Sequence, residues 1–235
     1  MGAGWSAGSA PGGSSSTTFD LAFAAAILPV IGKSLTTTLA VTLMSCVFAA
    51  LLGFGLEITR RSSMPMRYVM RFVIDFIRST PVLVQLYFLY YVLPVYGIKL
   101  PALVVGVAAL SIYYCGYLAE VFKAGIDGIA RGQFEAAKAL GLGRLQTVIL
   151  VVAPQMLRNI AAPMGSYFIS IFKSTPYLAV IAVPESFGSA LDIASDTFRY
   201  GEPMMVVGAI FLSIAVSFSW LIHGLEARLA LSARR

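Results

Sequence analysis

The sequence predicts an all-α membrane protein with five transmembrane helices. Hydrophobic residues make up 58% of its 235 positions and charged residues only 12%, whereas soluble domains carry about 25% charged residues. Apolar runs of the roughly 20 residues that cross a bilayer recur along the chain, and they exclude a water-soluble core. The predicted spans are residues 35–58, 68–94, 101–121, 148–183 and 203–225.

The cations predict how these spans are oriented. They gather after the first, third and fifth spans, while the segment after the fourth carries carboxylates. Because cytoplasmic loops are enriched in lysine and arginine, we expect the N-terminus outside and the C-terminus in the cytoplasm. The net charge of +6 indicates no nucleic-acid partner, because the cations form no single basic face. These cations are Arg60, Arg61, Arg67, Arg71, Lys123, Arg131, Lys138, Arg144, Arg228, Arg234 and Arg235.

The residues before the first span divide into two parts. Residues 1–18 are mostly glycine, serine and alanine, so we expect a disordered tail. Residues 19–34 hold a short apolar run that Pro29 and Gly32 interrupt, and we expect an interfacial segment on the outer surface. The transmembrane domain then covers residues 35–228, with a cytoplasmic loop at 123–147 and a cytoplasmic tail at 229–235.

No motif predicts a cofactor or metal bound by this chain. Gly32, Lys33 and Ser34 match the end of a phosphate-binding loop, but Ile27 stands where the upstream glycine is required. His223 has no cysteine or carboxylate neighbour at ligand spacing. We therefore expect no ATP and no metal on this polypeptide.

Prolines interrupt two of the predicted spans. Pro81 lies inside the second, and Pro163 and Pro176 lie inside the fourth. A proline in a membrane helix frees backbone groups that neighbours, water or a ligand must satisfy, and transporter sites often use such broken helices. Each proline is therefore either a kink relieved by a neighbouring helix or part of a site.

The most specific pattern is in the polar loop after the third span. Residues 135–154 place Glu-Ala-Ala, a glycine six residues after the glutamate, and a final proline at fixed spacing. Residues 133–140 are good helix formers, Gly141 can end a helix with a positive φ, and alanines leave room for close approach of a partner. This pattern predicts a short rigid helix, although an amphipathic helix on the membrane surface has a similar composition. The residues concerned are Gln133, Glu135, Ala136, Ala137, Leu140, Gly141 and Leu142.

This loop resembles the ATPase-contacting loop of bacterial ABC importer permeases. Other segments strengthen the resemblance: residues 78–85 read RSTPVLVQ, residues 117–135 lead into the loop, and residues 168–185 read FISIFKSTPYLAVIAVPE. From about residue 19 onward, the chain resembles permease subunits of polar amino-acid uptake systems of the histidine, glutamine and arginine type.

The resemblance implies a type I importer in the bacterial inner membrane. This chain would be its non-catalytic permease subunit, surrounded by lipid and paired with a second permease subunit that is identical or paralogous. A dimer of ABC ATPase subunits would bind ATP and Mg²⁺ and act through the loop helix, and an extracytoplasmic solute-binding protein would deliver an amino acid or related zwitterion.

Two cations inside spans are candidates for the substrate pathway, because charge in a membrane is costly and usually functional. Arg78 can bind a carboxylate through two parallel hydrogen bonds, or it can pair structurally with Asp75 or Glu120. Lys173 is followed by the hydroxyls of Ser174 and Thr175. Gln85 joins the candidates because it ends the RSTPVLVQ motif.

The chain departs from the family pattern at tyrosines. Tyr113 stands where relatives often have asparagine and is followed by Tyr114, and Tyr167 stands where glutamate is common. A cationic amino acid is therefore less favoured. The tyrosines either hold a cationic head group by cation–π contact or serve as aromatic packing.

The alternatives are a membrane transporter or channel that works alone and an intramembrane hydrolase. A stand-alone secondary transporter or channel would use Arg78 and Lys173 as relay groups but would leave the loop helix without a role. An intramembrane hydrolase would need Lys173 to activate Ser170 or Ser174 from hydrogen-bond reach.

Overall fold

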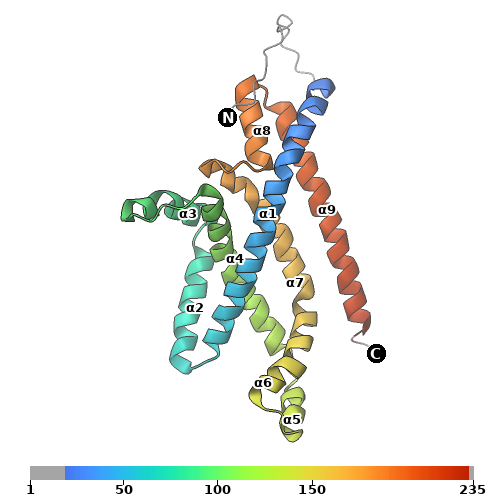
Figure 1. Ribbon diagram of the computed structural model, residues 1–235. Helices are drawn as coiled ribbons and strands as arrows, with labels where there is room; N and C mark the ends of the chain where they lie inside the picture. The colour runs from blue at the N-terminus through green and yellow to red at the C-terminus, as the bar shows by residue number, and fades with distance from the viewer. Residues whose placement is uncertain (1–18, 233–235) are drawn as a thin grey trace, which may run out of the picture.

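The computed structural model describes residues 19–232, and every regular element in that range is a helix (Figure 1). Residues 1–18, where we expected a disordered tail, lie outside the described residues. The α-helices are α1 Leu21–Arg60, α2 Met64–Ser79, α3 Val82–Tyr87, α4 Ala102–Asp127, α5 Arg131–Ala139, α6 Arg144–Thr147, α7 Ala153–Ser174, α8 Ser186–Thr197 and α9 Gly201–Ser232. Shorter π and 3-10 turns are η1 Phe88–Val92, η2 Leu93–Tyr96, η3 Val148–Val152 and η4 Thr175–Ile181.

Helix α1 is continuous for 40 residues, so the interruption expected at Pro29 and Gly32 was wrong. Its length of about 60 Å is twice the hydrocarbon thickness of roughly 30 Å. Ile27 and Ile31 are buried in a small core with Ala190 of α8 and Val207 of α9. This packing holds the segment helical through Pro29. The position of residues 19–34 relative to the membrane interface stays a prediction.

Within residues 19–232, four helical segments are long and apolar enough to cross a membrane: Leu21–Arg60, Ala102–Asp127, Leu145–Ile181 and Gly201–Gly224. The second predicted span differs from the expectation of one straight helix. It consists of Met64–Ser79 and Val82–Tyr96, which meet at 97°, so that α3 points away from the bundle in Figure 1. The break occurs at Pro81, because proline has no backbone N–H to donate to a helical hydrogen bond.

Helix α4 forms the centre of the bundle, with α1, α2, α3 and α7 packed around it. Small residues allow these helices to approach closely, as is common in membrane proteins. Gly53 of α1 lies against the α4 backbone, and Gly125 of α4 faces Met156 and Ile160 of α7. Helices α5 and α6 lie at one end of the bundle and α8 at the other (Figure 1).

Glu185 caps helix α8 at that other end. Its carboxylate accepts hydrogen bonds from the backbone N–H groups of Phe187 at 2.9 Å and Gly188 at 2.5 Å. Burial raises the pKa of Glu185 to about 7, and these two donors oppose the rise. The cap fixes α8 against α1, where the Ser186 backbone N–H donates to Thr38 Oγ1 at 3.0 Å.

We predict that Gly53→Ala destabilises the bundle. A Cβ at residue 53 would lie 2.8 Å from the Cys115 carbonyl oxygen and 3.0 Å from the Ala119 nitrogen, so the α1–α4 contact would have to open. Such overpacking costs about 1–3 kcal/mol. Thermal unfolding in mild detergent should therefore show a lower midpoint. The matched control is Gly55→Ala, since a Cβ there meets nothing within 4 Å; equal midpoints for the two variants would contradict the prediction.

Candidate functional site

The predicted loop helix is present as α5, Arg131–Ala139. Gly141 has φ +72°, so the expectation that it ends the helix with a positive φ is confirmed. The Gly141 N–H donates to the Lys138 carbonyl and the Leu142 N–H to the Ala137 carbonyl, both at 3.0 Å. This pair of bonds is the Schellman arrangement that closes many helices. The loop helix therefore has a defined end rather than a frayed one.

The side chains of α5 divide into an outward and an inward set. Leu140 is 78% exposed at the tip, and Glu135 and Ala136 are also exposed. Ala137, expected to face a partner, is instead 2% exposed. Gln133 accepts a hydrogen bond from Gln155 Nε2 at 3.1 Å. Its side chain thus ties α5 to α7.

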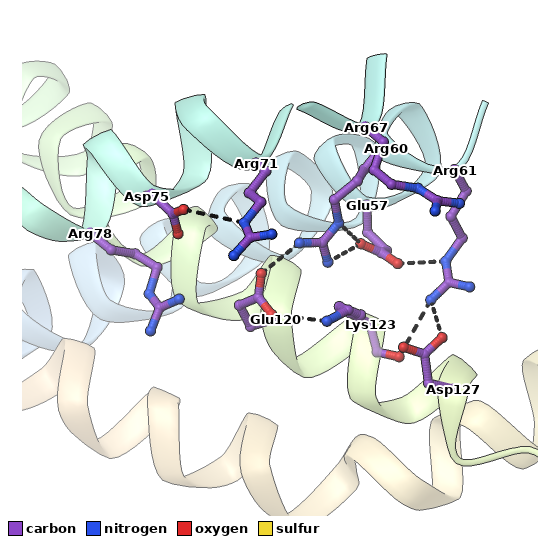
Figure 2. Close-up of a pocket in the computed structure, with 10 residues that line it drawn as sticks. All are labelled: Glu57, Arg60, Arg61, Arg67, Arg71, Asp75, Arg78, Glu120, Lys123 and Asp127. Atoms are coloured by element: carbon purple, nitrogen blue, oxygen red, sulfur yellow. Dashed lines mark hydrogen bonds and ion pairs between the residues drawn. The ribbon is translucent and has the colours of Figure 1, made fainter. Parts of the chain in front are cut away.

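An ion-pair network lies where α1 and α4 end (Figure 2). Glu57 is 1% exposed and accepts hydrogen bonds from Arg60 Nε at 2.6 Å and Arg61 Nε at 2.5 Å. Arg60 also donates to Glu120 and Arg61 to Asp127, each at 2.6 Å. Burial lowers the pKa of Arg61, but hydrogen bonds to Asp127 and Glu57 outweigh it and raise the pKa above its ordinary value. These ion pairs join the end of α1 to the end of α4.

Sequence reasoning used Arg60 and Arg61 only for orientation and missed Glu57. The available signal was local: a glutamate three and four residues before two arginines has the spacing of helical ion pairs.

Four tyrosines form a cluster between α4 and α7, which we call the tyrosine cluster: Tyr113, Tyr114, Tyr117 and Tyr167. Ring centroids of neighbouring members are 5.1–6.3 Å apart. The Tyr113 and Tyr117 hydroxyls are 3.1 Å apart. The rings therefore pack against one another, while binding of a cationic head group, the other expectation for these residues, stays a prediction. Sequence reasoning did not include Tyr117, which lies one helical turn after Tyr113.

Two of the predicted pathway residues lie at the tyrosine cluster. The Ser174 hydroxyl is 2.8 Å from the Tyr114 hydroxyl, which also donates to the Ser170 carbonyl at 3.0 Å. The Arg78 guanidinium carbon lies 5.1 Å from the centre of the Tyr117 ring. Neither Asp75 nor Glu120 pairs with Arg78 among the described residues; Asp75 lies 3.8 Å from Arg71 instead, so the expected structural pair was wrong.

The other pathway candidates lie elsewhere. Gln85 Nε2 donates to the carbonyls of Ile77 at 2.9 Å and Thr80 at 3.3 Å, and so caps α2 at the Pro81 break. Thr175 is buried and donates to the Phe172 carbonyl. Lys173 is exposed and lines a cavity of about 450 Å³ between α7 and α9.

The Ser-Lys pair that a hydrolase would need is not formed. Ser170 Oγ donates to the Ser166 carbonyl at 3.0 Å, and Ser174 is held by Tyr114. Within residues 19–232, no hydrogen bond joins Lys173 to either serine, so nothing in this region supports nucleophile activation.

The chain is similar in sequence to known transport proteins. A family model described as the binding-protein-dependent transport system inner membrane component matches residues 45–231. A probable amino-acid ABC transporter permease protein of Sinorhizobium fredii is 38% identical over 89% of this chain and 91% of its own length. A second such protein, from Vibrio harveyi, is 32% identical over 90% of this chain and 96% of its own length.

Solved structures of ABC transporters have a similar fold. A chain from a crystal structure of an amino acid ABC transporter with histidines superposes with a TM-score of 0.83 at 33% identity, covering 90% of this chain and 100% of that one. A chain of an inward-facing methionine ABC transporter superposes with a TM-score of 0.70 at 17% identity, covering 87% and 98%; it supports the fold.

We predict that Gly141→Ala loosens the end of α5. A non-glycine residue in the left-handed region costs about 1–2 kcal/mol, so backbone hydrogen exchange at residues 140–142 should accelerate by about tenfold. Gly132→Ala is the matched control, because residue 132 lies inside α5 with open space around it and alanine favours helix. Unchanged exchange in Gly141→Ala would contradict the assigned helix end.

Proposed function

The chain belongs to the family of binding-protein-dependent transport system inner membrane components, and from this membership we propose that it imports an amino acid or related zwitterion by motion transmitted from α5. It is a multi-pass inner-membrane permease subunit of an ABC importer. The family implies an ATPase and a solute-binding protein as partners. The stand-alone transporter or channel does not account for this membership.

The proposed assembly contains two permease subunits, identical or paralogous, and two ATPase subunits that bind ATP and Mg²⁺. This chain is then a non-catalytic subunit, with its N-terminus outside and α5 in the cytoplasm. The charge distribution supports that orientation, because α5, α6 and the adjoining ends of α1, α2 and α4 carry a cluster of cations.

One observation carries the coupling proposal: α5 is a capped helix with an exposed apolar tip, and its first turn is hydrogen-bonded to a membrane helix. Leu140 and Leu142 offer apolar contact at the tip, and the Gln133–Gln155 hydrogen bond links α5 to α7. At its far end, α7 carries Ser174, which contacts Tyr114 of the tyrosine cluster. A displacement of α5 by the ATPase therefore moves α7 against α4, where the tyrosine cluster lies.

The proposed substrate position is beside Arg78 and the tyrosine cluster. A cavity of about 310 Å³ between α4 and α7 is lined by Tyr117, Tyr167, Glu120, Asn159 and apolar neighbours, and Arg78 lies at its edge, against the Tyr117 ring. Arg78 has no carboxylate within 4 Å in the described part of the chain, so it can bind a substrate carboxylate. The tyrosine faces then favour the cationic end, since Glu120 is already held by Arg60. Lys173 remains a second pathway candidate on the side of α7 that faces α9.

We predict that Leu140→Ala uncouples ATP hydrolysis from transport. Burying a leucine side chain against a partner contributes about 1.5–3 kcal/mol, and alanine loses most of it, so ATPase stimulation by the binding protein should fall about fivefold or more. The assay measures ATP hydrolysis by the complex in lipid vesicles, together with the amount of ATPase subunit that copurifies. Leu157→Ala, an exposed leucine of α7 away from the tip, should behave as wild type. Full stimulation in Leu140→Ala would count against the proposal.

We predict that Arg78→Gln weakens substrate use. Loss of a hydrogen bond to a charged group costs about 1.5–3 kcal/mol, so the half-saturating substrate concentration should rise by about tenfold or more. The assay is binding-protein-dependent uptake with a panel of amino acids and zwitterions. Arg158→Gln, another exposed arginine of a membrane helix, is the control. Equal uptake by both variants would remove Arg78 from the pathway.

A further inference from the structure

A second cavity, at the α5 end of the bundle, shares Arg78 and Glu120 with the proposed substrate position, but its other lining residues have no part in the transport proposal. It has a volume of about 590 Å³ and lies between α1, α2 and α4. All the residues that line it are charged (Figure 2): Glu57, Arg60, Arg61, Arg67, Arg71, Asp75, Arg78, Glu120, Lys123 and Asp127. Six cations face four carboxylates, which leaves an excess of two positive charges.

Most of the carboxylates are already engaged on one side of this cavity. Both Glu57 oxygens accept from Arg60 and Arg61, Asp127 accepts from Arg61, and Glu120 accepts from Arg60. These groups neutralise one another and form a fixed wall. They leave little negative charge to balance the arginines of α2 on the other side.

The arginines of α2 are the unbalanced part. Arg67 and Arg78 have no carboxylate within 4 Å in the region the structure covers, and Arg71 has only a 3.8 Å contact with Asp75. Because the Arg71 and Asp75 side chains are both more than half exposed, that pair contributes little. Residues 67, 71 and 78 share one helical face. Because Arg78 lies against Tyr117 and is assigned to the substrate, the guanidinium groups of Arg67 and Arg71 are the ones available on this side of the cavity.

The neighbouring face of α2 has a different character. Tyr68, Phe72 and Phe76 are exposed there, and Tyr68 is the one nearest the arginine face. Tyrosine is typical of the membrane interface. The cavity therefore lies beside surface suited to the interfacial part of a lipid.

We propose that this cavity binds a phosphate group through Arg67 and Arg71, carried either by an acidic phospholipid of the adjacent leaflet or by a soluble phosphate compound. Guanidinium groups bind phosphate oxygens through paired, charge-assisted hydrogen bonds. Basic pockets between transmembrane helices bind anionic lipid head groups in the same way. The ligand would link α2 to the ion-pair network of α1 and α4. It would thereby hold α2 in place up to the break at Pro81.

The test uses the full chain, purified with its ATPase partner in mild detergent and stripped of lipid. Dioleoylphosphatidylglycerol, dioleoylphosphatidylcholine and inorganic phosphate are titrated separately, and native mass spectrometry together with the unfolding midpoint reports binding. The variants are Arg67→Gln, Arg71→Gln and the double variant, and Arg158→Gln is the control because it does not line the cavity. The loss of a charge-assisted hydrogen bond predicts about tenfold weaker binding for each single variant.

Selective binding of phosphatidylglycerol that the double variant loses and Arg158→Gln keeps supports the site with lipid as the source. Binding of inorganic phosphate with the same arginine dependence, without preference among lipids, supports the site with a soluble source. Equal binding of both lipids, or unchanged binding in a double variant with a wild-type unfolding midpoint, overturns the proposal. If the double variant has a lowered unfolding midpoint, the single variants Arg67→Gln and Arg71→Gln decide: weaker phosphate binding in either supports the site, and unchanged binding in both overturns it.

Discussion

Every peptide group that crosses a bilayer must find its hydrogen-bond partner inside the protein, and this constraint organises the chain. Long uninterrupted helices satisfy it automatically, as in α1 and α4. Where a helix breaks, a side chain takes over. Gln85 caps the carbonyls freed near Pro81, and Tyr114 donates to the Ser170 carbonyl near the point where α7 gives way to the 3-10 turn η4.

The candidate substrate-pathway residues lie beside these helix breaks. Arg78 lies just before the Pro81 break and contacts Tyr117, while Ser174 ends α7 and contacts Tyr114. The opposite end of α7 is bonded to α5 through Gln155. One helix therefore connects the exposed α5 with a polar cluster inside the bundle. An importer needs such a link, because force enters outside the membrane and the substrate crosses within it.

Much of this arrangement was predictable from sequence because it rests on local rules. Apolar runs, the cation distribution and the spacing from Glu135 to Pro154 predicted the helices, the family and the shape of the loop. Contacts between distant segments were not predictable in the same way. Pro29 looked like an interruption, but packing of Ile27 and Ile31 against α8 and α9 keeps the helix whole. Likewise, the 97° bend at Pro81 and the inward face of Ala137 depend on neighbours that no local pattern specifies.

In the proposed transport cycle, the tip of α5 receives force from a separate ATPase polypeptide. A photo-crosslinking amino acid at position 140, introduced into the assembled complex in membranes, shows directly what the tip contacts. We expect a crosslink between the permease and the ATPase subunit whose yield changes with bound nucleotide. Crosslinks to lipid alone, or modification of residue 140 by a reagent confined to the extracellular side, would contradict it.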